Sequence, residues 1–268
     1  MIQICRNRGL FSHTFTSADA RYQQMQQYLR LGIPHLDDVI KLYPGSLTLI
    51  QGELSLKVAR TFIAQLTVSL LSNNPETDLA FVDGANVFPY YNVSFEARKQ
   101  GFDPLSILDR IQLARAFNYH QVTEILTKKL PKLIDTNPSI RIVLVPQISS
   151  LYLSDEALQY LEYDKLTVVS SILELTQAVG KLKSLTIQND LIGLMTAENA
   201  PRSQKPLGGT FFAHAATDII RVEASPASRN SSSDYALLFT VQKGGPPVQA
   251  ALTHQQIGKQ QIPLTEFW

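Results

Sequence analysis

The sequence is poor in cysteine and has no long apolar run. Cys5 is the only cysteine among 268 residues, which excludes a disulfide framework and a zinc site built from cysteines. A membrane span needs about 18 consecutive apolar residues, and no such run occurs. Arg6 and Arg8 are not followed by the hydrophobic stretch of a signal peptide. We therefore expect a cytoplasmic protein with no membrane partner.

Charge of either sign is also scarce. Lys and Arg number 24 against 23 Asp and Glu, so the formal net charge is +1 and no strong field of one sign surrounds the molecule. This excludes a wholly electrostatic binder of nucleic acid or acidic membranes. Charged residues make up 18% of the chain, below the usual fraction of about 25%. This low fraction favours a surface that is partly covered by a partner.

Short β-branched segments alternate with longer segments of helical periodicity, which is typical of a mostly parallel sheet flanked by helices. Near-continuous apolar runs predict buried parallel strands at Ser46–Gln51, Leu79–Asp83, Arg141–Pro146 and Leu191–Thr196. Helices are predicted at Lys57–Ser72, Ser94–Gln100, His120–Leu133 and Tyr163–Lys183. After Asp218, "DIIRVE", a polar stretch and "YALLFTVQK" predict a C-terminal antiparallel hairpin.

A phosphate-binding loop is expected where the first strand runs into a helix, but the sequence there is degenerate. A working loop needs Gly-x-x-x-x-Gly-Lys-Ser/Thr, so that backbone amides, a lysine and a hydroxyl surround phosphate and magnesium. Counting from Gly52, the lysine and hydroxyl positions hold Val58 and Ala59. Allowing one deletion brings Lys57 into register, but Leu56 then replaces the preceding glycine. Gly52 and Lys57 are therefore at most vestiges of a nucleotide site.

Six blocks occur in an order that suggests a family. They are "LGIPHLDDVI" from Leu31, "GSLTLIQGE" from Gly45, "FVDGANVF" from Phe81, "GFDPLSILDRIQLARAFNYHQ" from Gly101, "RIVLVPQISSLY" from Arg141 and "KPLGGTFFAHAATDIIRV" from Lys205. Together they resemble the ATPase core of the RecA/RadA recombinase superfamily, on the side of the RadA-like paralogs. The resemblance implies an α/β fold: a RecA-like P-loop NTPase core over residues 31–268 behind an N-terminal arm of residues 1–30. With about thirty residues ahead of the core, we expect the chain to lack the helical N-terminal DNA-binding domain of full recombinases.

The resemblance also shows where catalytic groups are missing. The glutamate that activates water in family members corresponds to Ala85. Pro146 and Gln147 stand where a magnesium-associated aspartate is expected, and an Asn-Gln pair that senses the γ-phosphate corresponds to Ala197 and Glu198. Phosphoryl transfer depends on positioning and charge neutralisation, so each loss removes a separate contribution. We therefore predict a pseudo-ATPase with no catalytic residue, metal or cofactor.

Several polar residues have two interpretations each. Lys57 is a solvated lysine in the first turn of a helix, or it keeps a contact to a phosphate or an acidic group. Asp83 pairs locally at a strand end, or it binds metal. For His120 and His214, a hydrogen-bonded structural role is favoured over acid-base catalysis.

The N-terminal arm carries a candidate docking motif. In RadA-type recombinases a Phe-x-x-Ala segment adds as a strand to the neighbouring protomer, and its Phe and Ala fill two pockets. Phe15 and Ala18 match this motif at a similar spacing from the core. Phe212 and Ala215 also match, but inside a core block. The resemblance therefore implies that Phe15 and Ala18 bind a RecA/RadA-like recombinase, a sister paralog or a second copy, and the alternative is that they pack on their own core.

Family members hold single-stranded DNA in two loops. The second corresponds to "AENAPRSQKPLGG", where Arg202 and Lys205 are the only cations. The first carries four acidic residues, which repel phosphate: Asp155, Glu156, Glu162 and Asp164. Tyr160 and Tyr163 could stack on bases, but helix packing is favoured at this spacing. We expect at most weak contact with single-stranded DNA, through Arg202 and Lys205.

These features predict a non-catalytic recombinase paralog that aids homologous recombination and DNA repair by joining a RecA/RadA-like partner. Two alternatives remain open. One is an ATPase with a non-standard loop that acts on DNA, in which Lys57 and Glu53 take the missing roles. The other is a RecA-like regulatory scaffold unrelated to DNA.

Overall fold

A computed structural model describes most of the chain from residue 28 onward. The described residues are 28–31, 36–38, 40–52, 56–153, 165–200, 203, 205–224, 235–244 and 249–253. At 56–59, 165–168, 235–236 and 251–253 only the backbone is described. Phe15 and Ala18, Arg202, and the acidic residues and tyrosines of the first loop lie outside these ranges.

The described elements alternate between strands and helices. The strands are β1 (Leu47–Gly52), β2 (Asp78–Asp83), β3 (Ile111–Arg115), β4 (Ile140–Val145), β5 (Ile192–Ala197), β6 (Asp218–Ala224), β7 (Tyr235–Lys243) and β8 (Gln249–Thr253). The helices are α2 (Leu56–Asn73), α3 (Tyr90–Lys99), α4 (Pro104–Asp109), α5 (Tyr119–Glu124), the π-helical η2 (Ile125–Lys129), α6 (Leu130–Thr136), α8 (Lys165–Asn189) and α9 (Phe211–Ala215). None of these helices is long and apolar enough to cross a membrane.

The eight strands form one sheet in the order β3-β2-β4-β5-β1-β6-β7-β8. Strands β1 to β6 run parallel, whereas β7 and β8 join antiparallel to β6. Because β4 and β5 lie between β2 and β1, chain segments far apart in sequence meet at the centre of the sheet. This arrangement confirms the predicted α/β, RecA-like core with its C-terminal antiparallel hairpin.

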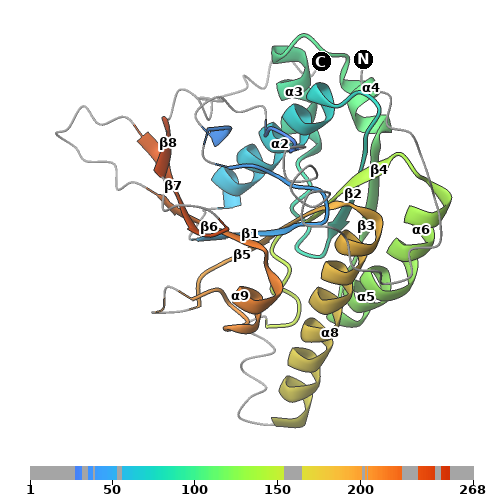
Figure 1. Ribbon diagram of the computed structural model, residues 1–268, viewed down its shortest axis with the longest axis vertical. Coiled ribbons are helices and arrows are strands. Elements are labelled where there is room, and N and C mark those ends of the chain that lie inside the picture. Colours follow the sequence, from blue (N-terminus) through green and yellow to red (C-terminus); the bar gives the residue numbers. More distant parts are fainter. Residues whose placement is uncertain are drawn as a thin grey trace, which may run out of the picture.

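Helices cover both faces of the sheet (Figure 1). On one face α2, α3 and α4 pack over an apolar cluster in which the rings of Phe62 and Phe239 lie 5.4 Å apart. On the other face α5, η2, α6, α8 and α9 pack over a second cluster that includes Tyr152 and Phe212. The central strands are buried on both faces, which explains their near-continuous apolar sequences.

The four strands predicted from apolar runs are confirmed to within one residue at each end. Strands β3 and β8 were not predicted. Helix α3 begins at Tyr90 rather than Ser94, because Pro89 occupies its N-terminal cap and leaves the following residues free to be helical.

The prediction of one continuous helix at His120–Leu133 was wrong in detail. The segment is α5, a π-turn and α6, and the Leu130 amide donates to the carbonyl of Ile125, five residues back. Pro131 has no amide hydrogen and cannot make the next α-helical bond. The wider π-turn sits directly before this proline, as expected for a local break in the helical ladder.

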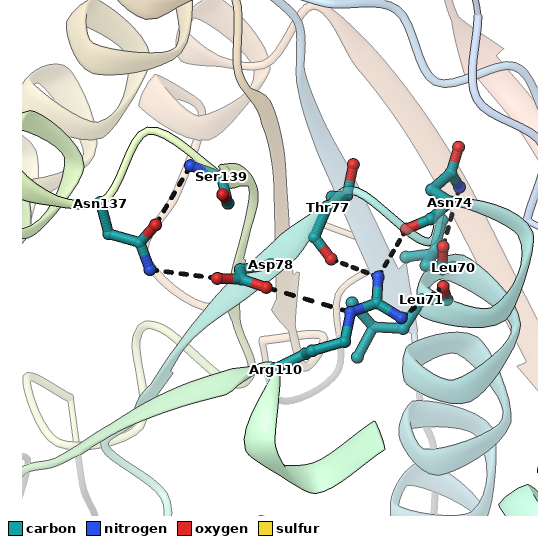
Figure 2. A network of polar contacts seen from close by, with 8 residues as sticks. All are labelled: Leu70, Leu71, Asn74, Thr77, Asp78, Arg110, Asn137 and Ser139. Atoms are coloured by element: carbon teal, nitrogen blue, oxygen red, sulfur yellow. Dashed lines mark hydrogen bonds and ion pairs between the residues drawn. The ribbon is translucent and has the colours of Figure 1, made fainter. Parts of the chain in front are cut away.

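Arg110 holds together the amino-terminal ends of β2 and β3 (Figure 2). Its guanidinium donates to the carbonyls of Leu71 (3.0 Å), Asn74 (2.5 Å) and Thr77. Its Nε lies 3.9 Å from Asp78, which also accepts a bond from Asn137 (3.1 Å). One side chain thus joins the end of α2, the following turn and the start of β2, at the edge opposite the candidate site.

Candidate functional site

The candidate site is the carboxyl edge of the parallel strands. Strands β1, β2, β4 and β5 end there at Gly52, Asp83, Val145 and Ala197. In open α/β sheets, ligands bind beyond this edge. Ala85, Pro146, Gln147, Ala197 and Glu198, where the sequence suggested lost nucleotide groups, lie at these strand ends or within two residues of them, whereas Val58 and Ala59 lie in α2.

Gly52 has a packing role at the end of β1. Its φ is +154°, and a Cβ built on it would lie 1.8 Å from the carbonyl oxygen of Val222 in β6. Only glycine fits this close approach of two backbones. Lys57 follows as the second residue of α2, where only the backbone is described. Packing against β6 therefore requires a glycine at position 52, whether or not a phosphate binds.

Asp83, at the end of β2, is fully buried and pairs locally. Its two carboxylate oxygens accept from the backbone amides of Val87 (2.8 Å) and Phe88 (3.2 Å). Arg115, opposite it in β3, lies 3.6 Å away. This geometry confirms the interpretation of Asp83 as a local cap, and it leaves neither oxygen without a partner. The pairing with Arg115 was missed, because it depends on the unpredicted strand β3.

The residues that follow β4 and β5 contact each other. The Gln147 amide nitrogen Nε2 donates to the Glu198 carboxylate at 3.0 Å, and the Gln147 backbone amide donates to Thr196 Oγ1 at 2.8 Å. Gln147 has a φ of +46°, a left-handed conformation that is uncommon outside glycine. Gln147 and Glu198, which the resemblance places where family members carry other polar groups, therefore hydrogen-bond to each other.

The two histidines lie in different helices, α5 and α9. His120 Nδ1 lies 2.9 Å from the Glu174 carboxylate and joins α5 to α8, so the predicted hydrogen-bonded histidine is present here. His214 is exposed in α9, and its carbonyl accepts from Lys183 (3.1 Å). No group of three or more His, Cys, Asp or Glu residues able to hold a metal occurs in the part of the chain that the structure describes.

The second loop is partly described. Asn199 and Pro206 form an isolated bridge, and the Ala200 amide donates to the Lys205 carbonyl at 2.8 Å. The side chain of Lys205 is exposed. The structure thus presents one of the two predicted cations to solvent, and Arg202 lies outside the described residues.

Two acidic groups have raised pKa values, Tyr152 after β4 and Asp218 at the start of β6. Burial raises the pKa of Tyr152, whose hydroxyl lies 2.8 Å from Thr123 Oγ1. Burial raises the pKa of Asp218 to about 6, and the nearby Lys243 partly offsets the shift. Lys243 itself donates to the carbonyls of Ala213 and Ala216 at the end of α9. Asp218 lies at the opposite edge of the sheet from the candidate site, whereas Tyr152 follows the end of β4 and packs in the second apolar cluster.

The fold and its carboxyl edge define a RecA-like α/β core, and comparison with known proteins identifies the family. The Rad51 family model matches residues 29–229, three quarters of the chain, so the chain belongs to the Rad51 family within the RecA/RadA superfamily. This confirms the resemblance drawn from the sequence blocks.

Two curated relatives are plant proteins. One is described as DNA repair protein RAD51 homolog 1 from Arabidopsis thaliana, 23% identical over 216 residues. The other is described as DNA repair protein RAD51 homolog from Solanum lycopersicum, 22% identical over 216 residues. Each alignment covers 76% of this chain and 62% of the relative, so the chain matches less than two thirds of the relatives' length.

Proposed function

We propose that this chain is a non-catalytic recombinase paralog, an accessory in homologous recombination and DNA repair that binds a RecA/RadA-like partner. Membership of the Rad51 family and relatives described as DNA repair proteins support the pathway. The local pairing of Asp83 and Glu198 at the carboxyl edge supports the lack of catalysis. The chain would occupy one subunit position in a filament or a small complex without hydrolysing ATP.

The observation that carries this proposal is the pairing of the polar groups at the carboxyl edge. Magnesium prefers oxygen ligands from carboxylates and phosphates. Asp83 uses both oxygens on the backbone amides that follow it, and Glu198 accepts from Gln147. Ala85 has no side chain that could activate water, and it packs against the apolar cluster of α2. The polar side chains that the structure describes at this edge therefore pair within the chain, which favours a role without bound magnesium and nucleotide.

We expect the purified protein neither to bind nor to hydrolyse ATP appreciably. Isothermal titration calorimetry with MgATP tests binding, and a phosphate-release assay tests turnover. Lys57→Ala is the matched variant, because Lys57 is the residue on which the alternative ATPase depends. A micromolar dissociation constant, or a turnover that Lys57→Ala abolishes, would contradict the proposal and favour the alternative.

The partner surface is proposed at the edge of the sheet. Within the described part of the chain β3 pairs only with β2, so its other side offers free backbone donors and acceptors. Such an edge accepts an added strand from a second protein. The arm with Phe15 and Ala18 would supply such a strand to a neighbour. The arm would thus donate a strand to one neighbour, and the β3 edge would accept a strand from another.

DNA affinity of the isolated chain is expected to be weak and strongly salt-dependent, because only Arg202 and Lys205 supply charge in the second loop. Each phosphate that is neutralised steepens the log–log salt slope by about 0.7 for single strands. Fluorescence anisotropy with a single-stranded oligonucleotide over a salt series measures this slope. Tight binding near molar salt, or binding unchanged in Arg202→Ala with Lys205→Ala, would show that DNA binds elsewhere.

A scaffold unrelated to DNA remains the competing function. Affinity purification from the native cell, followed by identification of the co-purifying chains, separates the two. Recovery of recombination proteins supports the proposal, and recovery of an unrelated complex supports the scaffold.

A further inference from the structure

The outer face of α8 is unusual for a surface helix. Over residues 169–188, all of which the structure describes, no exposed side chain is charged. The charged residues of this stretch, Glu174, Lys181 and Lys183, are all partly buried. Surface helices normally carry charged and polar residues opposite the core. Depletion of charge is instead the mark of the centre of a protein interface.

Exposed apolar residues and small uncharged residues follow this face in one stripe. Val169, Leu173, Thr176, Gly180, Ser184 and Ile187 recur every three or four residues and so lie along one side of the helix. Val169, Leu173 and Ile187 are 54%, 64% and 56% exposed. The first turns of α8 extend beyond the other helices and strands (Figure 1). A row of exposed apolar residues on a projecting helix marks a site of association.

The stripe has a large side chain at Leu173 and no side chain at Gly180, seven residues later. A Cβ built on Gly180 would meet no atom within 4 Å, so the space above it is open. In an antiparallel helix pair, a leucine on one helix can fill the space over a glycine on the other.

Two residues of opposite charge lie beside the stripe, so the stripe of one copy can pair its charges with those of a second copy. Glu174 and Lys181 are seven residues apart, or about two turns, and therefore lie on the same side of α8. If two copies of α8 pack antiparallel about a two-fold axis near residue 177, Leu173 of one copy faces Gly180 of the other. The same axis brings Glu174 of each copy, whose Oε1 contacts His120 of its own chain, opposite Lys181 of the other. One arrangement of the two helices therefore pairs a large residue with a small one and a negative side chain with a positive one.

We propose that the outer face of α8 binds a second copy of this chain, through an antiparallel, two-fold symmetric helix pair. A two-fold contact uses the same surface on both subunits and closes after two copies. It differs from strand addition by the N-terminal arm, which joins unlike surfaces. The contact is independent of the proposed role in recombination, and it would let two chains present their β3 edges and arms to separate neighbours.

Analytical ultracentrifugation over a concentration series tests the contact. The chain is expected to pass from monomer to dimer, and Leu173→Glu is expected to raise the dimer dissociation constant about thirtyfold or more, as for an interface hot spot. Leu105→Glu is the matched control, because Leu105 is a 74% exposed leucine on α4, and it should leave the dimer unchanged. Circular dichroism checks that each variant is folded. A chain that stays monomeric at the highest concentration overturns the proposal.

Cross-linking tests the direction of the two helices. In a Cys5→Ser background, Thr176→Cys lies close to the two-fold axis and should form a disulfide between copies on mild oxidation. Ile187→Cys lies far from the axis and should not. Equal cross-linking at both positions would indicate a parallel pair and overturn the antiparallel geometry. Phe15→Ala should leave the Thr176→Cys cross-link intact, and its loss in that variant would assign self-association to the arm.

Discussion

Arg110→Met is expected to lower the free energy of unfolding by about 3 kcal/mol, because it breaks a partly buried network of hydrogen bonds made by a charged group. The carbonyls of Leu71, Asn74 and Thr77 each lose a donor. Asp78 loses the cation beside it and keeps only the amide of Asn137. Methionine retains the length of the side chain, so the effect reports polar contacts more than lost volume.

Chemical denaturation followed by circular dichroism measures this loss. Arg98→Met is the control, because Arg98 is exposed at the end of α3, and it should change stability by no more than about 0.5 kcal/mol. Arg110→Lys should fall between the two, since one ammonium cannot reach three carbonyls in the planar arrangement of a guanidinium. An Arg110→Met variant as stable as Arg98→Met would show that these bonds contribute nothing net to folding.

The parallel core could be predicted because its strands are buried on both faces. Burial forces runs such as "LTLIQG" and "IRIVLV" to be apolar almost throughout. Strand β3 escaped prediction because it lies at the edge of the sheet. Its five residues, "IQLAR", are mostly half-buried and mix polar with apolar side chains. The sequence signal of an edge strand is correspondingly weak.

The sequence predicted where the candidate site lies but not the contacts between its residues. Family motifs pointed to the positions after β2, β4 and β5, and these positions do lie along one edge. The contact of Gln147 with Glu198 could not be foreseen, because it depends on β4 and β5 being neighbours in the sheet. Asp83 was interpreted correctly as a local cap, but its partner Arg115 belongs to the unpredicted β3.

Phe15→Ala is expected to weaken association with the recombinase partner about thirtyfold or more, while the monomer stays folded. If the arm adds as a strand to a neighbour, its phenyl ring is buried only in the complex. Loss of such an anchor costs on the order of 2 kcal/mol or more, and each 1.4 kcal/mol is about a factor of ten. Ala18→Glu should act similarly, because it places a charge in a small apolar pocket where desolvation is unfavourable.

The second Phe-x-x-Ala match supplies the control that separates docking from folding. Phe212 is a residue of α9 and is fully buried in the second apolar cluster of the core. This copy of the motif is therefore part of the core. Phe212→Ala should therefore cost several kcal/mol of folding stability, about 3 to 5 kcal/mol for a buried phenylalanine. Thermal melts beside pull-downs compare the two variants. If Phe15→Ala melts as early as Phe212→Ala and still binds the partner, Phe15 packs on its own core and the arm does not dock.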